Sequence, residues 1–251
     1  MISLALFPLL SFGLCTFVPR EALVAQLPFA VGERLTYDVS LEKGGTVGEG
    51  VMWVEGPEEI RGTSTYRLRF DSHVRVALFR GVSTSSSWFD PERKSSLRYQ
   101  KRERNLLTHE DVSVEIYPGQ KKWTSADGNG GTSPDDSPLD ELSFIYFIRT
   151  LELTPGATYQ FDRHFDAARN PVVIKVVRVE VIPTALGELK TIAVEMHVRD
   201  PKHYKGDGVI RFNFTADRCR LPARIESTMP LVGKAVMTIK AENAYPACAA
   251  I

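Results

Sequence analysis

The fold is decided by one stretch near the middle of the chain, Ser137-Pro138-Leu139-Asp140-Glu141-Leu142-Ser143-Phe144-Ile145-Tyr146-Phe147-Ile148-Arg149-Thr150-Leu151. Ser137 is a typical helix N-cap, and Pro138 suits the first helical position because its missing N–H has no intrahelical partner there. Thr154-Pro155-Gly156 stops the helix, which gives a length of about 14 residues. Apolar side chains occupy almost every side of this helix, so the pattern predicts that the rest of the chain surrounds it.

Most of the remaining sequence has the alternating pattern of half-buried β-strands. Leu35 to Leu41 is the first such run, Gly44-Gly45 is expected to turn the chain into the second, and Gly56-Pro57 is expected to end it. Further runs lie at 66–76, 81–89, 96–101, 112–117, 121–123, 159–161, 172–181, 192–198, 210–214, 221–225 and 232–239. About a dozen short strands without βαβ alternation favour an all-antiparallel fold.

A sheet of about a dozen strands is expected to curl, because large open sheets rarely stay flat. The sequence therefore predicts a mostly β fold, with one large curved antiparallel sheet or half-open barrel wrapping one central apolar α-helix. Burying about six large side chains of this helix contributes on the order of 10 kcal/mol, which is comparable with the net stability of a domain. The helix is therefore expected to be required for folding, while the glycine-rich stretch 125–137 is expected to be a surface loop.

The first 26 residues are expected to form a signal peptide. The chain is apolar from Met1 to Val18, and the pattern favours cleavage near Ala25 or Gln26. Because no basic residue precedes the apolar segment, an N-terminal membrane anchor is the main alternative. After cleavage we expect an exported periplasmic or envelope protein that does not span the membrane.

Charge and length suggest one neutral domain. We expect a single β domain at residues 27–242 and a C-terminal tail at 243–251. The 251 residues include 31 Lys and Arg and 31 Asp and Glu, so the net charge is zero. A neutral chain lacks the electrostatic footprint of nucleic-acid binding, and no nucleic-acid partner is predicted.

Two cysteines, Cys219 and Cys248, remain beyond the leader. An even pair in an oxidising compartment favours a disulfide that ties the tail to the sheet. Two unpaired thiols are the alternative, because geometry decides whether a bridge forms.

Three short segments carry a resemblance to a known family. The domain opens with Phe29-Ala30-Val31-Gly32-Glu33-Arg34-Leu35-Thr36-Tyr37, continues with Asp140 to Arg149 in the helix and has Pro183-Thr184-Ala185-Leu186-Gly187-Glu188-Leu189-Lys190-Thr191 later. In this order and spacing the segments resemble the bacterial family of domains of unknown function numbered 3108. The resemblance covers residues 27–242 and implies a secreted or envelope-associated protein without established activity. A curved sheet around a helix is also similar to periplasmic lipoprotein carriers, at the level of fold alone.

No motif in the sequence indicates an enzyme. A nucleophile elbow, a phosphate loop, a dinucleotide fingerprint and a paired-histidine zinc pattern are all missing from it, so no catalytic residue, cofactor or metal is predicted. Two groups combine a histidine with two carboxylates, namely His164 with Asp162 and Asp166, and His203 with Asp200 and Asp207. Both groups lie on polar stretches, where solvated side chains are a simpler interpretation than a metal site.

Aromatic residues at alternating strand positions, including Trp53 and Trp88, are interpreted as ordinary β core. One helix is not expected to fill a barrel of this circumference, which favours a cavity for a lipid or another apolar ligand between sheet and helix. The expected wall of this cavity consists of Phe144, Tyr146, Phe147, Phe212 and Phe214.

Two other functional classes stay open. One is a structural envelope protein with a filled core that contacts another envelope protein, and the other, less favoured, is a hydrolase with an unrecognised site. Arg149, near the end of the helix, is expected only to interact favourably with the helix dipole.

Overall fold

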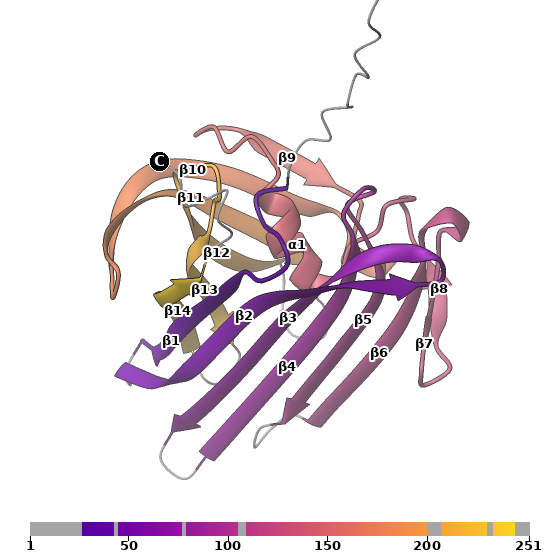
Figure 1. Cartoon of the computed structure of the whole chain (residues 1–251), viewed down its shortest axis with the longest axis horizontal. Coiled ribbons are helices and arrows are strands. Elements are labelled where there is room, and N and C mark those ends of the chain that lie inside the picture. The colour runs from indigo at the N-terminus through magenta and orange to yellow at the C-terminus, as the bar shows by residue number, and fades with distance from the viewer. Residues whose placement is uncertain are drawn as a thin grey trace, which may run out of the picture.

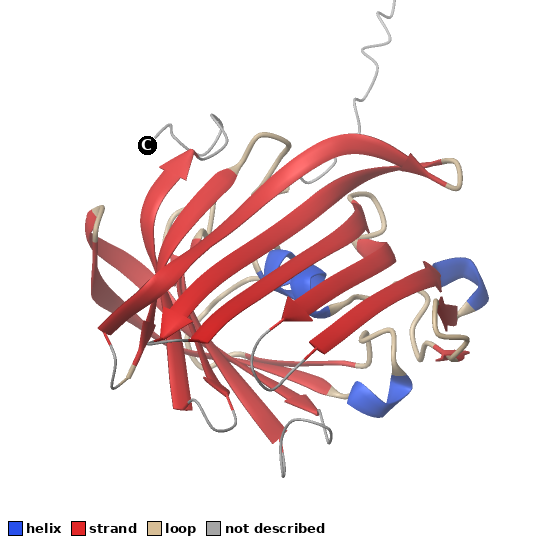
Figure 2. Cartoon of the chain, turned by 90° about the horizontal axis from the view of Figure 1, so that it is seen from below, coloured by secondary structure: helices blue, strands red, loops and turns tan. Residues whose placement is uncertain are grey.

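The computed structural model describes residues 27–42, 45–76, 79–104, 109–199, 207–229 and 233–243. Within these ranges the chain forms one sheet of 14 strands, one α-helix and two short 3-10 helices (Figure 2). The expected leader, with Ala25 and Gln26, lies outside the described residues.

The first eight strands are β1 (Arg34–Leu41), β2 (Gly45–Ile60), β3 (Thr63–Val76), β4 (Phe79–Asp90), β5 (Ser95–Arg104), β6 (His109–Tyr117), β7 (Lys122–Ser125) and β8 (Gly130–Thr132). The helix α1 (Glu141–Ile148) follows. The last six strands are β9 (Thr158–Phe161), β10 (Val172–Thr184), β11 (Gly187–Arg199), β12 (Asp207–Thr215), β13 (Pro222–Met229) and β14 (Gly233–Asn243). The 3-10 helices are η1 (Pro118–Gln120) and η2 (Ala167–Arg169).

Two antiparallel meanders make up the sheet. Its spatial order is β8-β7-β6-β5-β4-β3-β2-β1-β14-β13-β12-β11-β10-β9, so the halves join where β1 pairs with β14. β8 and β9 are the two edges, and the sheet therefore stays open. Figure 1 shows the two halves curling toward each other with α1 between them. The predicted half-open antiparallel sheet around one helix is confirmed, with 14 strands in place of about a dozen.

One expected turn and one expected loop differ in the structure. Gly56-Pro57 lies within β2, where the register against β3 shifts between Glu55 and Glu58, and the turn comes at Arg61-Gly62. The stretch expected to be entirely loop contains the short strand β8. At Gly56-Pro57 the shift in register lets β2 continue past a dipeptide that would usually end a strand.

The expected start of the helix at Ser137 and Pro138 is wrong. Asp140 is the N-cap, and its carboxylate accepts hydrogen bonds at 2.9 Å from the backbone N–H groups of Leu142 and Ser143. The Ser143 hydroxyl accepts the Asp140 N–H at 2.8 Å, which completes a capping box. The helix has eight residues rather than about 14, because this box fixes its first turn three residues later than predicted and the helix ends at Ile148, before the expected stop at Thr154-Pro155-Gly156.

The segment before α1 and the segment after β9 connect the two edges of the sheet. The Ser133 N–H donates to the Lys121 carbonyl at 2.8 Å, while the Ser133 hydroxyl donates to the Phe165 carbonyl at 3.0 Å. Leu139 receives a hydrogen bond from the Phe165 N–H at 2.9 Å and donates one to the Arg163 carbonyl at 2.6 Å. These bonds tie the β7 side of the sheet to the β9 side.

The main core is one large apolar cluster that α1 shares with both halves of the sheet. Phe144 and Ile148 of the helix belong to the same cluster as Ile116 of β6 and Phe212 of β12. The prediction that the helix is surrounded is therefore confirmed.

Trp53 is not part of this cluster, contrary to its interpretation as ordinary core, whereas Trp88 is buried in a small second core cluster with Ile60 and Leu97. Met52 and Val54 belong to it, so Trp53 between them faces the other side of the sheet. Each indole ring has two guanidinium groups within 5.5 Å of its centroid, those of Arg34 and Arg69 for Trp53 and those of Arg67 and Arg98 for Trp88. These cation–π contacts connect five neighbouring strands on the outer face.

Candidate functional site

A buried ion pair lies directly after α1. Arg149 is only 1% exposed, and its two terminal nitrogens meet the two oxygens of Glu33 at 2.7 Å each. The same guanidinium donates to the Cys219 carbonyl at 3.0 and 3.1 Å and to the Pro28 carbonyl at 2.8 Å. Arg149 therefore links the end of α1 to the N-terminal segment with Pro28 and Glu33 and to the turn with Cys219. The prediction that it interacts only with the helix dipole is wrong.

Two phenols lie beside this ion pair. The hydroxyls of Tyr37 and Tyr146 are buried without a hydrogen-bond partner among the described residues. Burial raises the pKa of both phenols, and the negative charge of Glu33 raises it further. Burial lowers the pKa of Arg149, but the Glu33 carboxylate outweighs this and holds it above its ordinary value. The centre thus contains one fixed salt bridge and two neutral phenols.

A second buried polar group holds the start of α1. The Ser87 hydroxyl of β4 donates to the Asp140 carboxylate at 2.5 Å, and the Ser96 hydroxyl of β5 donates to the Ser143 hydroxyl at 2.8 Å. Burial raises the pKa of Asp140 to about 6 despite these hydrogen bonds. A serine that donates directly to a carboxylate, with no histidine between them, is not arranged as an activated nucleophile. The group positions the helix against the sheet.

The five aromatic residues expected to line a cavity are all 5% exposed or less, and all belong to the main core cluster. The rings of Phe144 and Phe147 meet edge to face at 6.3 Å, and those of Phe212 and Phe214 stack at 5.4 Å. These ring contacts join the residues in two pairs, and the role of the five as a ligand-binding wall stays a prediction.

Of the two groups that combine a histidine with carboxylates, the structure describes the one around His164 and not the one around His203. His164 is buried, and its Nδ1 accepts the Asp166 N–H at 3.1 Å. Asp200 and His203, with the side chain of Asp207, lie outside the described residues. Within the described ranges, no group of three His, Cys, Asp or Glu side chains is placed to hold a metal.

The structure describes one of the two cysteines of the expected disulfide. Cys219 is buried and disulfide-bonded. Its expected partner, Cys248, lies outside the described residues, so the pairing stays a prediction.

A pocket of about 200 Å³ opens beside the buried ion pair. We call it the basic pocket, and its lining consists of Leu27, Pro28, Lys94, Arg149, Thr150, Arg218 and Arg220. Four of these seven residues are cationic and none is acidic. Arg220 donates to the Arg149 carbonyl at 3.2 Å, whereas the side chains of Lys94 and Arg218 have no partner among the described residues. Two cationic groups are therefore available at the pocket to bind an anion.

Asp217, the carboxylate closest in sequence, forms no ion pair with these cations in the described part of the chain. Asp217 accepts hydrogen bonds from the N–H groups of Cys219 and Arg220, at 2.8 and 3.1 Å, and from the Thr215 hydroxyl at 2.9 Å. These bonds hold its carboxylate against the backbone of the turn that carries Arg218.

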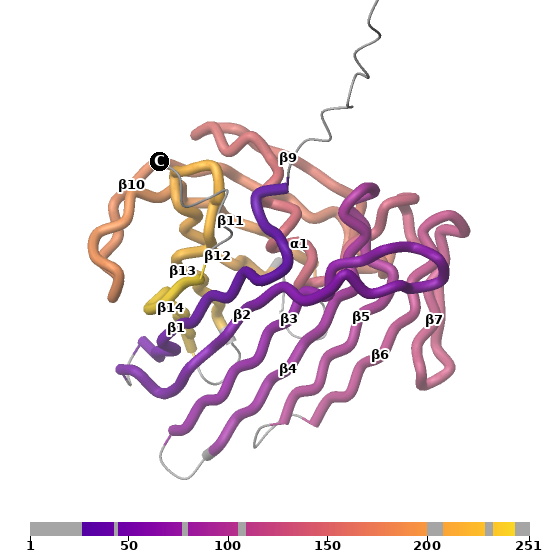
Figure 3. Tube along the Cα trace, in the orientation of Figure 1, coloured from indigo at the N-terminus to yellow at the C-terminus, as the bar shows by residue number. Residues whose placement is uncertain are grey.

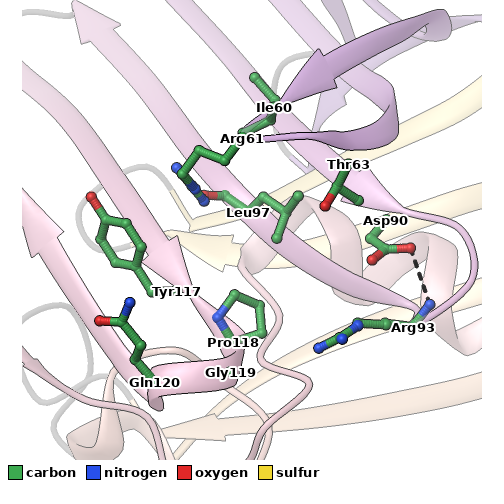
Figure 4. Close-up of a pocket in the computed structure, with 10 residues that line it drawn as sticks. All are labelled: Ile60, Arg61, Thr63, Asp90, Arg93, Leu97, Tyr117, Pro118, Gly119 and Gln120. Atoms are coloured by element: carbon green, nitrogen blue, oxygen red, sulfur yellow. Dashed lines mark hydrogen bonds between the residues drawn. The ribbon is translucent and has the colours of Figure 1, made fainter.

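A second pocket, of about 300 Å³, lies at the end of β2 and β6 (Figure 4). Two of its three charged side chains, those of Arg61 and Asp90, already have partners. Arg61 forms an ion pair with Glu115 and donates to two backbone carbonyls, while Asp90 accepts the backbone N–H groups of Glu92 and Arg93. This pocket is a weaker candidate, because a ligand would have to displace existing bonds.

Sequence reasoning missed the basic pocket, because its cations come from three separate segments. Lys94 lies in the turn after β4, Arg149 follows α1, and Arg218 and Arg220 lie in the turn before β13. The sequence Arg218-Cys219-Arg220 was the one local signal available.

Comparison with solved structures shows the fold. A β-barrel-like protein of unknown function (DUF1849) from Brucella abortus is 12% identical, with a TM-score of 0.60 over 86% of this chain and 99% of that chain. A protein from Bacteroides fragilis with a YmcC-like fold, inferred to be exported, is 14% identical over 86% of this chain and 98% of that chain. The TM-score of this pair is 0.35.

Other comparisons concern sequence. None of the curated proteins compared with the chain matches it. Within the described ranges, no helix has the length and hydrophobicity needed to cross a bilayer. A family model matches residues 36–240, most of the chain, as the resemblance predicted. The chain therefore belongs to the family described as a protein of unknown function, DUF3108.

Proposed function

We propose that this protein is an exported envelope protein with a filled core, which binds a small oxyanion such as a phosphate group in the basic pocket. One observation carries the proposal: four cationic residues and no carboxylate line a pocket, and of the four only Arg149 is in an ion pair among the described residues, with Glu33. Such a local excess of positive charge attracts an anion of matching size. The apolar segment at the start of the sequence supports export.

The packing of the interior favours binding at the surface over binding between sheet and helix. The five aromatic residues expected at the cavity wall contact one another or other core residues, and neither of the two pockets described above includes them. We therefore favour the filled-core alternative over the apolar carrier. Neither pocket holds the nucleophile and base of an enzyme, so we propose a binding role without catalysis.

Thermal unfolding with added phosphate tests the binding site. We expect 20 mM phosphate to raise the melting temperature above that in chloride of equal ionic strength. The Lys94→Gln/Arg218→Gln double variant removes both available cations and should lose this difference. Arg80→Gln, an exposed change at the opposite end of β4 from Lys94, should keep it.

Two other outcomes of the thermal-unfolding experiment would contradict binding in the basic pocket. An equal shift in all three proteins would mean that phosphate acts by general exclusion, and no shift in the unmodified protein would reject the oxyanion proposal. Parallel measurements with free glycerol phosphate and with phosphatidylglycerol vesicles separate a soluble ligand from a lipid headgroup.

Export and the filled core are tested on protein from the cell envelope. Mass spectrometry of the purified chain should show a mature N-terminus near residue 26 or 27, and a mass that retains residues 1–20 would favour the membrane anchor. Native mass spectrometry should give the mass of the bare chain. A co-purifying lipid of fixed mass would instead support the apolar carrier.

A further inference from the structure

One edge of the sheet is left uncovered along strand β10. β9 pairs with Val172 to Lys175 alone, and Gly156 and Ala157 exchange hydrogen bonds with Val176 at 2.8 and 2.9 Å. From Val177 to Thr184 the outward side of β10 has no strand partner among the described residues. An edge of this kind presents free backbone N–H and C=O groups to another strand.

Exposed apolar side chains concentrate on this edge. Val177, Val179 and Val181 are 41%, 45% and 57% exposed, and Leu186 in the following turn is 42% exposed. They are four of the six large apolar residues that are exposed in the described part of the chain. Single exposed apolar residues are common on protein surfaces, but a group of them along an open strand indicates a contact surface.

The uncovered sequence is complementary to itself. It reads Val177-Arg178-Val179-Glu180-Val181, and an antiparallel copy centred on Val179 places each Arg178 opposite Glu180 of the other chain. In the same alignment Val177 lies opposite Val181. Cross-strand pairs of opposite charge and of β-branched residues both stabilise antiparallel sheets.

The charges on the edge are positioned for such pairing. The Arg178 side chain is 64% exposed, and it forms an ion pair with Glu180 of its own chain at 2.7 Å. In the alignment centred on Val179, two such pairs would form a four-charge cluster across the junction. A network of this kind specifies both the register and the identity of the partner strand.

We propose that the β10 edge binds the β10 edge of a second copy of this chain, forming a two-fold symmetric dimer with one continuous sheet. Closed two-fold pairing uses the same patch on both molecules, as this self-complementary segment requires. Pro183, which has no N–H, and the cover over Val176 limit the pairing to about five residues on each chain. The contact is therefore small, and we expect reversible association in the micromolar range or weaker.

The alternative is an edge that merely protects itself. Charged residues and proline on edge strands often prevent aggregation, and Arg178, Glu180 and Pro183 fit that description as well. Under this alternative the chain stays monomeric at every concentration, so the two interpretations predict different masses in solution.

Sedimentation equilibrium of the mature chain tests the proposal over a concentration range up to about 0.5 mM. The unmodified protein should change from monomer to dimer, and Val179→Lys, which places two positive charges at the symmetry axis, should abolish dimers. Val76→Lys changes a valine of similar exposure on another strand and should leave association unchanged. Circular dichroism confirms that each variant is folded.

Charge exchange provides the most specific test. Arg178→Glu makes the edge entirely acidic and Glu180→Arg makes it entirely basic, so each variant alone should be monomeric. Mixed in equal amounts, they should form a heterodimer, because every charged pair across the junction is then opposite in sign. A monomeric unmodified protein, a dimer insensitive to Val179→Lys, or a mixture that fails to associate would each overturn the proposal.

Discussion

At the scale of single residues, Glu33 and Arg149 carry the largest expected energetic effect. Their side chains are fully buried, so removing one charge leaves the other without a partner in a medium of low dielectric constant. We expect Glu33→Gln to reduce the free energy of unfolding by about 3–5 kcal/mol, measured by urea denaturation. The double variant Glu33→Leu/Arg149→Met should lose less than Glu33→Gln. A loss below 1 kcal/mol in Glu33→Gln would show that the ion pair does not hold these segments together.

Asp140 gives a prediction about pH. Its pKa in the folded protein is about 6, above the ordinary value of 3.8, so the folded state binds the proton more tightly than the unfolded chain. The favourable contribution of the protonated group is therefore fully present below about pH 4 and is lost as the pH rises through 6. The total loss is on the order of 3 kcal/mol.

Comparison with Asp140→Asn isolates this effect. The asparagine oxygen can still cap α1 but does not titrate. We expect the stability of the native protein relative to the variant to fall between pH 4 and pH 7, in urea denaturation at several pH values. Asp162→Asn, at an exposed position, is the control. Parallel stability profiles for native protein and Asp140→Asn would contradict the proposed titration.

The sequence indicated which residues were unusual but not what they contact. Arg149 stood out as a charge beside an apolar run, yet its partner Glu33 is 116 residues away. Trp53 and Trp88 have the spacing of core residues, and their outward direction depends on which face of the sheet the helix covers. Such choices arise from long-range packing, which local periodicity does not encode.

At the scale of elements, α1 is the part of the structure that sequence predicted best in role and least well in length. Its apolar surface identified it as buried, because no other environment accepts such a helix. The predicted start of the helix was wrong, because Ser137 and Asp140 are both good N-caps. The choice between them depends on Ser87 of a distant strand, which donates a hydrogen bond to Asp140.

The buried position of α1 predicts the effect of a charge on it. Phe147 is 5% exposed and contacts Phe144 and Phe161 edge to face. Phe147→Asp should prevent accumulation of soluble protein, since an unpaired carboxylate would be buried in the core. Phe147→Leu keeps an apolar side chain and should remain soluble with a lower melting temperature. A soluble Phe147→Asp protein with an unchanged melting temperature would place this side chain in solvent.

At the scale of the whole molecule, the fold class followed from the sequence because local signals agree throughout. Nearly every strand pairs with its neighbour in sequence, so turns and alternation determine most of the sheet. The pairing of β1 with β14 is the exception, and no local pattern indicates it. Figure 3 shows these two strands, from opposite ends of the chain, side by side.

This long-range pairing predicts slow folding. Arg34 lies opposite Asn243, so the last contact of the sheet closes a loop that contains almost the whole domain. Contacts between residues so distant in sequence slow folding, because the chain must be ordered before they form. A circular permutant converts this pairing into a local one: a flexible linker of about ten residues joins residue 243 to Leu27. New termini at Asp127 and Gly128 open an exposed turn.

We expect the permutant to keep the native circular dichroism spectrum and to refold faster in stopped-flow fluorescence than a linear chain of residues 27–243, which lacks Cys248 as the permutant does. The acceleration should come from β14 and β1, which become a hairpin, while the opened turn removes only the short edge pair of β7 and β8. A control chain has the same linker but its new termini lie between β1 and β2, at residues 43 and 44. It keeps the β14–β1 hairpin and makes the β1–β2 pair long-range instead. Equal refolding rates for the linear chain and the first permutant would show that closure of the two halves does not limit folding.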